Sequence, residues 1–200
     1  MMAKVCGLTC REDVALTLAA GADLLGFLHH PASPRHCPDL GLARAAGARA
    51  ALVAVAASAE ELLALARRAG AGWVQPYLPP AERAEGLARL RAECRRVLLP
   101  WPDDPDQEAL PADLYLWEAS PSATGLFGGS GQGHPMAHPP PGPFLLGGGL
   151  HGAVLAERLR ALPGHADCRG FDAASRLESA PGRKDPLLVA AFVRNAHALE

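Results

Sequence analysis

The chain has 200 residues, a formal net charge of −2 at pH 7, 49% hydrophobic residues and 20% charged residues. This is the composition of a soluble globular domain that can bury a core without metals or disulfides. Its 21 glycines and 19 prolines are spaced between apolar segments, which excludes collagen-like, coiled-coil and disordered chains. A near-neutral charge with no basic cluster argues against nucleic-acid binding, so we expect a single domain over residues 1–200.

The cysteines and the start of the chain predict a cytoplasmic location. Five cysteines are an odd number, and none forms a C-x-x-C pair, so neither a zinc site nor a disulfide framework is indicated. The first residues lead into a strand-like segment and lack the apolar core of a signal peptide. The longest apolar run, residues 50–57, is far shorter than the ~20 residues of a membrane-spanning helix.

Short strand-like runs recur along the whole chain and alternate with stretches of helical period. The predicted strands are residues 4–8, 24–28, 51–55, 72–75, 96–99, 113–117, 144–147 and 169–173. The predicted helices are residues 12–19, 58–68, 79–94, 152–162 and 185–197. The second helix begins with Ser58 and has Glu61 three residues later, which is the pattern of a capping box.

The alternation of strands with helices predicts βα units and a parallel sheet. Eight strands, each followed by a connecting segment, predict a (β/α)8 TIM barrel. The barrel has to be compact, because 200 residues are fewer than the typical length of about 250. The fifth and sixth units are expected to be shortened, since Pro, Gly and His replace helix formers in residues 101–110 and 131–143. The alternative, an open doubly wound sheet, would carry G-x-G-x-x-G after its first strand. Residues 6–9 read CGLT instead, which favours the closed barrel.

In such a barrel the functional residues lie at the C-terminal ends of the strands. Two glycine groups stand there: residues 128–131 (GGSG) after the sixth strand, and Gly148 with Gly149 after the seventh. Glycines leave backbone amides bare, which suits a phosphate, and the second group precedes a helix whose dipole favours an anion. Each group could equally be an ordinary turn or helix stop.

Several segments in the same order resemble one enzyme family, phosphoribosylanthranilate isomerase of the tryptophan pathway. The segments that carry the resemblance are residues 4–9 (KVCGLT), 31–35 (PASPR), 116–118 (LWE), 128–131 (GGSG), 148–150 (GGL) and 171–185 (FDAASRLESAPGRKD). They span both ends of the chain. The resemblance implies an Amadori rearrangement of N-(5-phosphoribosyl)anthranilate to 1-(2-carboxyphenylamino)-1-deoxyribulose 5-phosphate, without a cofactor.

The resemblance also implies the catalytic pair. The family's base is the Cys of K-x-C-G, here Cys6, and its acid is the carboxylic acid after the sixth strand, here Glu118. Cys6 would need an accessible thiolate with a pKa lowered by positive neighbours. Glu118 would need a pKa raised towards neutrality by burial. The competing interpretations are a core cysteine and a surface carboxylate paired with an arginine.

The family pattern assigns the substrate's two anions to different residues. Arg35 is expected to meet the anthranilate carboxylate, and Asp172 a substrate hydroxyl. The alternatives are a solvated loop arginine and a carboxylate that caps the following short helix. The residues expected at the phosphate are Gly148, Gly149 and Ser175, with Gly128, Gly129 and Ser130 folding over as a lid.

The sequence departs from the family pattern at several positions. Residues 99–100 (LP) replace Lys-Ala after the fifth strand, Ala174 replaces the first Ser of the pair after the eighth strand, and Arg176 replaces a Gly. Two further departures lie near the expected chemistry. Tyr77, in residues 75–78 (QPYL), replaces the His of Q-L-H-G, and Glu118 replaces Asp. The extra methylene of Glu118 shifts its carboxyl by about 1 Å, which matters in catalysis. Three hypotheses follow: the isomerase, another phosphosugar-binding barrel enzyme, or a non-catalytic anion-binding descendant. We expect a small phosphorylated ligand, no nucleic-acid or membrane partner, no metal, and a monomer or homodimer.

Overall fold

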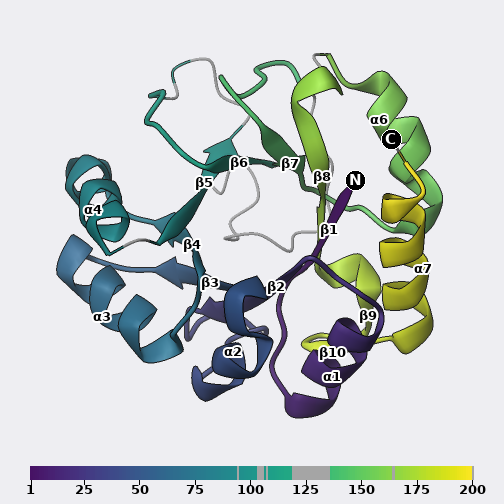
Figure 1. Ribbon diagram of the computed structural model, residues 1–200, viewed down its shortest axis with the longest axis horizontal. Helices are drawn as coiled ribbons and strands as arrows, with labels where there is room; N and C mark the ends of the chain where they lie inside the picture. Colours follow the sequence, from purple (N-terminus) through teal and green to yellow (C-terminus); the bar gives the residue numbers. More distant parts are fainter. Residues whose placement is uncertain (94, 103–105, 107, 119–135, 164, 200) are drawn as a thin grey trace.

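The computed structural model describes residues 1–93, 95–102, 106, 108–118, 136–163 and 165–199. Within them, eight parallel strands form a closed barrel in sequence order, and β1 pairs with β8 to complete the ring (Figure 1). The predicted (β/α)8 barrel is thus confirmed. A small antiparallel sheet of β9 and β10 lies outside the barrel, beside α1.

The elements follow the predicted alternation. The barrel strands are β1 Met2–Val5, β2 Leu24–His29, β3 Ala50–Val55, β4 Trp73–Tyr77, β5 Arg96–Pro102, β6 Leu114–Glu118, β7 Phe144–Leu146 and β8 Cys168–Ala173. The α-helices are α1 Arg11–Ala19, α2 Gly41–Ala46, α3 Ala59–Ala69, α4 Pro80–Ala92, α6 Leu155–Ala161 and α7 Pro186–His197. The short elements are the 3₁₀ turns η1 Gly47–Arg49, η2 Gly152–Val154, η3 His165–Asp167 and η4 Ser175–Leu177, and the strands β9 Glu178–Ala180 and β10 Arg183–Lys184.

Alternation along each strand divides the apolar residues into two layers. On β3, Leu52 and Ala54 belong to the large layer between the strands and the helices, whereas Ala51 and Val53 face the barrel interior. The lower interior is an apolar cluster of Leu24, Ala51, Trp73, Leu98, Leu114, Leu116 and Leu145, with Met2 against it. Both faces of the strands are therefore buried, as expected for a parallel barrel.

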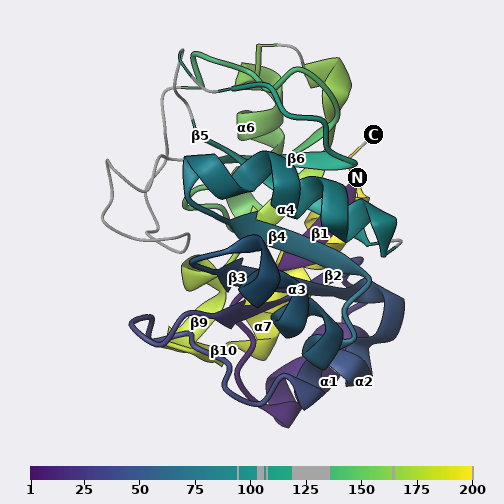
Figure 2. The same ribbon diagram turned by 90° about the vertical axis from the view of Figure 1, so that its left-hand side faces the viewer.

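Side-chain caps fix the starts of helices α3 and α7. Ser58 caps α3 by accepting a hydrogen bond from the Glu61 amide at 3.2 Å. Asp185 caps α7 by accepting from the amides of Leu187 and Leu188 at 2.8 and 3.0 Å. Helices α3 and α4 lie side by side outside β3 to β5 (Figure 2).

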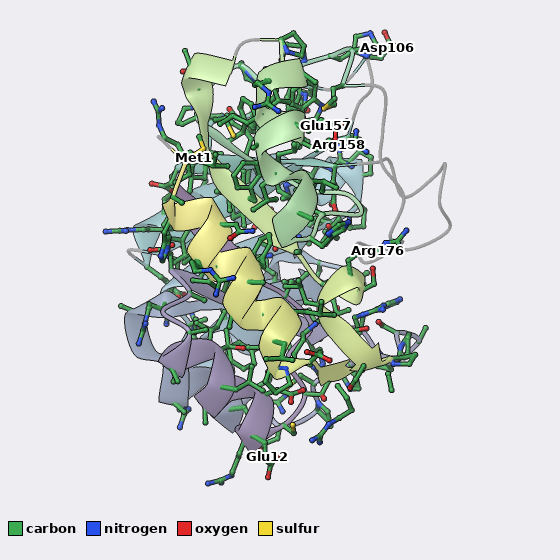
Figure 3. The ribbon with its side chains drawn as sticks, turned by 90° about the vertical axis from the view of Figure 1, so that its right-hand side faces the viewer. Met1, Glu12, Asp106, Glu157, Arg158 and Arg176 are labelled. Atoms are coloured by element: carbon green, nitrogen blue, oxygen red, sulfur yellow. The ribbon has the colours of Figure 1, made fainter. Side chains whose placement is uncertain are left out.

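Helix α7 joins the two ends of the chain. It packs against β1, and the terminal amino group of Met1 donates to the carbonyls of Ala196 and Leu199 at 3.1 and 2.8 Å (Figure 3). Among the described helices, α7 included, none is both long enough and apolar enough to cross a membrane.

The fifth and sixth units are covered differently. Residues 106 and 108–113, the described part between β5 and β6, contain no helix, in line with the predicted shortening; most of the sixth unit lies outside the described residues. Aromatic side chains cover these strands instead: Trp101 meets Tyr115 edge-on at 5.6 Å, and Trp117 meets Phe144 at 5.4 Å between ring centres. The Trp101 indole also donates to the His138 carbonyl at 2.9 Å.

Some local predictions were wrong. Strand β1 ends at Val5 instead of residue 8, because Gly7 turns the chain with φ +79°. The helix predicted at 152–162 is split into η2 and α6. Helix α2 and the β9–β10 hairpin were not predicted, because elements of two to six residues are too short to show a period.

Candidate active site

The upper interior of the barrel, at the C-terminal ends of the strands, holds a cluster of polar side chains. Lys4, Gln75 and Glu118 are buried there, with at most 7% of their surface exposed, and Tyr77 and Asp172 lie with them. Burying such groups is unfavourable unless they are paired. In this cluster they pair with one another, except that Oε1 of Gln75 has no hydrogen-bond partner among the described residues. Buried polar side chains in an otherwise apolar barrel mark this end as the candidate site.

Cys6 follows β1 and sits half-buried at the edge of this cluster, next to Leu28, Val53 and Tyr77. Its amide donates to the Ala173 carbonyl at 2.9 Å. Gly26 on the neighbouring strand makes room for it, since a Cβ there would stand 2.6 Å from the Cys6 sulfur. Cys6 is thus at the site, as predicted, and is not a residue of the main core.

The lowered pKa that a resting thiolate at Cys6 would need is not found in this structure. Burial raises the pKa of the Cys6 thiol, and the Asp172 carboxylate adds to this. The Lys4 ammonium acts in the opposite direction but does not outweigh burial. The resting form is therefore a thiol, and two cations, Lys4 and Lys184, act on it.

Lys4 is the cation at the centre of the cluster. Its Nζ lies 2.7 Å from Oδ1 of Asp172. Burial by itself would lower the pKa of Lys4, but the charges of Asp172, Cys6 and Glu118 together raise it, so Lys4 stays protonated. The capping role considered for Asp172 is not seen: among the described residues, no side-chain hydrogen bond caps η4.

Glu118 ends β6 with its carboxyl buried, 7% exposed. Its Oε1 accepts a hydrogen bond from the Tyr77 hydroxyl. Burial raises the pKa of Glu118 to about 7, although the Tyr77 hydrogen bond and Lys4 both pull it down. A raised pKa is what a general acid needs. The burial of Glu118 and its hydrogen bond from Tyr77 exclude a solvated surface carboxylate paired with an arginine.

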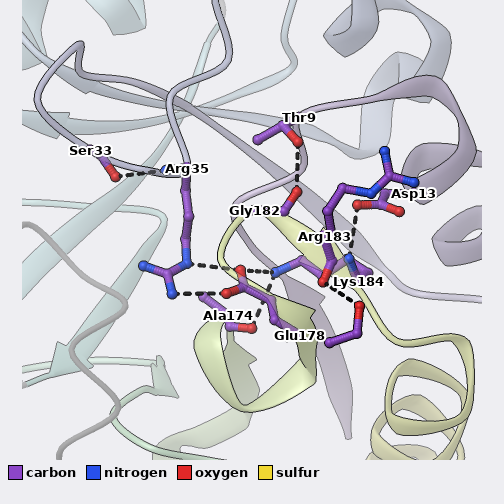
Figure 4. Close-up of polar contacts among 10 residues, drawn as sticks. Thr9, Asp13, Ser33, Arg35, Ala174, Glu178, Gly182, Arg183 and Lys184 are labelled. Atoms are coloured by element: carbon purple, nitrogen blue, oxygen red, sulfur yellow. Dashed lines mark hydrogen bonds and ion pairs between the residues drawn. The ribbon is translucent and has the colours of Figure 1, made fainter.

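Arg35 lies beside the cluster in a chain of buried charges (Figure 4). Its Nε and Nη2 donate to the two carboxylate oxygens of Glu178, both at 2.8 Å. Lys184 donates to Oε1 of Glu178 at 2.9 Å and to the Ala174 carbonyl at 3.1 Å. Burial favours the neutral form of Glu178, but Arg35 and Lys184 outweigh it and lower the pKa of that carboxyl. Arg35 is therefore no solvated loop residue.

The β9–β10 hairpin holds this chain of charges in place. Lys184 donates its backbone amide to Asp13 of α1 at 2.9 Å, and the Thr9 hydroxyl donates to the Gly182 carbonyl at 2.7 Å. Gly7 lets the arginine lie close, since a Cβ there would stand 2.8 Å from the Cδ of Arg35. Because Glu178 takes the edge of the guanidinium formed by Nε and Nη2, the edge formed by Nη1 and Nη2 can face a second carboxylate.

The loops expected to hold a phosphate lie at the ends of neighbouring strands. Gly148 and Gly149 follow β7 with φ of +94° and +65°, and Ser175 opens η4 after β8, which pairs with β7. Among the turn, loop and cap hydrogen bonds of the described residues, none is donated by the backbone amides of these three residues to a backbone carbonyl. Gly128, Gly129 and Ser130, the predicted lid, lie outside the described residues.

Sequence reasoning assigned no role to five residues of this site: Lys4, Gln75, Tyr77, Glu178 and Lys184. The first three could have been found from the alternation of side chains along a strand, because Lys4 shares a strand face with Cys6, and Gln75 shares one with Tyr77. Glu178 and Lys184 gave no such signal, since their short hairpin has no readable period.

Comparison with known proteins identifies the family. The N-(5'-phosphoribosyl)anthranilate isomerase of Azorhizobium caulinodans is 35% identical over 216 residues, covering 98% of this chain and 92% of the relative. This chain belongs to the phosphoribosylanthranilate isomerase family. The isomerase from Thermus thermophilus has the same fold, with a TM-score of 0.78 and 27% identity over the whole of both chains. TrpF from Jonesia denitrificans gives 0.77 and 30% over 99% of this chain and 97% of its own. No family model matches.

The members of this family are enzymes. Membership in it also gives meaning to two of the departures from the family pattern, Tyr77 and Glu118. They lie far apart in sequence but share one hydrogen bond in the site.

Proposed function

We propose that this chain is a phosphoribosylanthranilate isomerase that converts N-(5-phosphoribosyl)anthranilate to 1-(2-carboxyphenylamino)-1-deoxyribulose 5-phosphate. The observation that carries the proposal is the buried Glu118 carboxyl, with a pKa of about 7, in one cluster with Cys6 around the Lys4 ammonium. A carboxylic acid with a pKa near neutrality and a nearby cysteine that can form a thiolate are the acid and base that the rearrangement needs.

In the first step, neutral Glu118 gives its proton to the furanose ring oxygen. The bond between that oxygen and C1 breaks, and the anthranilate nitrogen forms a double bond to C1, giving a protonated Schiff base and an open chain. Glu118 is left as a carboxylate, which the Lys4 ammonium and the Tyr77 hydroxyl stabilise.

In the second step, Cys6 first releases its thiol proton to water, and the Lys4 ammonium favours the thiolate that forms. This thiolate removes the proton from C2. The electron pair of that C–H bond forms a double bond between C1 and C2, and the nitrogen recovers its lone pair as an enolamine. The C2 hydroxyl then loses its proton while C1 gains one, which gives the ketone. The cation that supports the Cys6 thiolate during this step is Lys4. C1 is reduced as C2 is oxidised, so the reaction takes no cofactor.

The substrate's anions match the charges around the cluster. The outer edge of Arg35 suits the anthranilate carboxylate, because Glu178 already holds the other edge in place. The phosphate is assigned to the amides of Gly148, Gly149 and Ser175, and Asp172 to a ribose hydroxyl. The lid role of residues 128–130 stays a prediction.

The test is complementation of a tryptophan auxotroph that lacks this isomerase, with purified-enzyme turnover followed by loss of phosphoribosylanthranilate fluorescence. Growth together with turnover is expected. Turnover of another ribose or ribulose phosphate, without growth, would favour a related phosphosugar enzyme. Phosphate binding without turnover of any of these compounds would favour a non-catalytic descendant.

A further inference from the structure

We propose that Tyr77 is a positioning residue for Glu118: its hydroxyl fixes one carboxyl oxygen so that the other carries the transferable proton, and Gln75 holds Tyr77 in turn. The inference rests on the proposed function, in which Glu118 is the general acid. It concerns a pair of residues at which this chain departs from the pattern of its family.

The geometry is a chain of hydrogen bonds across the barrel interior. The Gln75 side-chain amide donates to the Tyr77 hydroxyl at 3.0 Å, and that hydroxyl donates to Oε1 of Glu118. Tyr77 lies on β4 and Glu118 on β6, with β5 between them, so the contact passes over β5. There, Pro100 and Pro102 share the face of β5 that carries Leu98 and have no side-chain donors or acceptors that would compete.

The hydroxyl of Tyr77 is a permanent donor in this environment. Burial raises the pKa of Tyr77 well above its ordinary value, and the Glu118 charge raises it further, so the phenol keeps its proton at neutral pH. Because Oε1 of Glu118 accepts that proton's hydrogen bond, the acidic proton of neutral Glu118 sits on Oε2.

The charged neighbours of Glu118 come from two further strands. Asp172 on β8 raises the pKa of Glu118, and Lys4 on β1 lowers it, as the Tyr77 hydrogen bond does. Cys6 faces Tyr77 and Lys4. Removing the Tyr77 hydroxyl leaves the effects of burial, Asp172 and Lys4 in place, so the change that follows reports the hydroxyl alone.

The departures at Tyr77 and Glu118 are therefore one structural unit. The longer Glu118 side chain and the Tyr77 hydroxyl meet, so that each substitution fits the other. This predicts that the family's pair, built as Tyr77→His with Glu118→Asp, is more active than Tyr77→His alone.

The experiment compares Tyr77→Phe with a matched control, Tyr115→Phe. Tyr115 is the chain's other tyrosine; it faces away from the interior, and its hydroxyl donates to the Leu110 carbonyl. The Glu118 carboxyl is titrated by infrared difference spectroscopy, with Glu118→Gln assigning the band. Tyr77→Phe should raise the pKa of Glu118 by about one unit and move the apparent pKa near 7 of the kcat/KM profile by the same amount. Its kcat should fall about 10-fold with KM within about twofold, and Tyr115→Phe should change neither.

A second variant covers loss of folding. If Tyr77→Phe does not fold, Gln75→Leu, which removes only the donor to Tyr77, should raise the pKa of Glu118 by a smaller amount. An unchanged Glu118 titration in the folded variant overturns the inference, as does a Tyr77→His, Glu118→Asp pair no better than Tyr77→His alone.

The infrared titration needs no turnover, so it separates the two hypotheses. A shifted carboxyl in a protein without isomerase activity contradicts the proposed function and leaves the Tyr77–Glu118 coupling standing. Normal wild-type turnover with an unshifted carboxyl in Tyr77→Phe contradicts the inference and leaves the proposed function standing.

Discussion

The two ends of the barrel interior are built from the same strands but do opposite things. At the N-terminal end the inward side chains are apolar and fully packed. At the C-terminal end they are Lys4, Tyr77, Glu118 and Asp172, paired with one another. Strand β6 passes from one end to the other, with Leu114 and Leu116 below and Glu118 above.

The difference teaches where this fold gains stability and where it gives some up. Burying Leu side chains stabilises the folded state by roughly 1.5–3 kcal/mol each. Burying the Glu118 carboxyl acts the other way, because its pKa moves from 4.5 to about 7. The lower end should therefore set stability and the upper end chemistry, and substitutions at each end can test this separation.

The largest effect is expected at Cys6. Cys6→Ser should lower kcat at least about 100-fold, since a serine hydroxyl is too weak an acid to act as the base, while the melting temperature and ligand affinity stay near those of the wild type. Steady-state turnover and thermal unfolding measure the two sides. Cys10→Ser, at the start of α1, is the matched control and should keep its activity. A Cys6→Ser enzyme with more than about a tenth of wild-type activity would remove Cys6 from proton transfer.

Glu118→Gln should lower the activity and raise the stability of the protein. Turnover should fall nearly as far as in Cys6→Ser, and Glu118→Asp should keep measurable turnover. Burial raises the pKa of Glu118 from 4.5 to about 7. The contribution of Glu118 to the free energy of unfolding is therefore fully present below pH 4.5 and is lost as the pH rises through 7. Glu118→Gln should thus be more stable than the wild type by about 3 kcal/mol at pH 8 and equal to it at pH 4.

Denaturant unfolding at the two pH values gives the answer for Glu118→Gln. The exposed Glu85 supplies the control Glu85→Gln, which should leave both readouts close to wild type. Near-normal kcat in Glu118→Gln would remove Glu118 from the mechanism. Equal stability of Glu118→Gln and the wild type at both pH values would show that burial of Glu118 carries no cost.

At the lower end, Leu98→Ala should reverse the pattern. Leu98 is fully buried in the interior cluster, so its truncation should cost about 2–5 kcal/mol of the free energy of unfolding. The kcat of the folded fraction should stay within about twofold. Urea unfolding and kinetics at a temperature well below the melting point measure both. A tenfold loss of kcat in the folded enzyme would show that the two ends are coupled.

A smaller effect is expected at the edge of the site. Glu178→Gln removes the carboxylate that holds Arg35 and pairs with Lys184, so KM should rise about 10-fold with a smaller change in kcat. An analogue without the carboxylate, N-(5-phosphoribosyl)aniline, serves as the control substrate. Its KM should be the same for the variant and the wild type; an equal rise for both substrates would show that Glu178 supports the fold and not carboxylate recognition.

The smallest effect is expected in the glycine loop. Gly148→Ala, at φ +94°, should weaken inhibition by inorganic phosphate several-fold, because the strained loop moves its amides away from the anion. Gly21→Ala, at φ +86° with open space around it, carries similar strain away from the loop and should not change the inhibition constant. Equal inhibition constants for Gly148→Ala and the wild type would place the phosphate elsewhere.

Much of the fold could be predicted from the sequence, because the decisive signals are local. Alternation of apolar runs with helical stretches located eight strands, and Ser58 and Asp185 cap the helices that follow them. The candidate site residues came from short motifs at strand ends. Helix α2 and the β9–β10 hairpin were not predicted, because they are too short for a hydrophobic period to be recognised in the sequence.

What the sequence determined by itself is the set of elements and the chemical groups at their ends: Cys6 after the first strand and Glu118 at the end of the sixth. Only the tertiary structure decided what those groups experience. A base at Cys6 would need a lowered pKa, which the sequence cannot show; in the structure the pKa of Cys6 rises, because burial of the thiol outweighs the effect of Lys4. The pairings of Arg35 with Glu178 and of Tyr77 with Glu118 join residues 143 and 41 positions apart, and contacts at such distances arise only when the strands close into a ring.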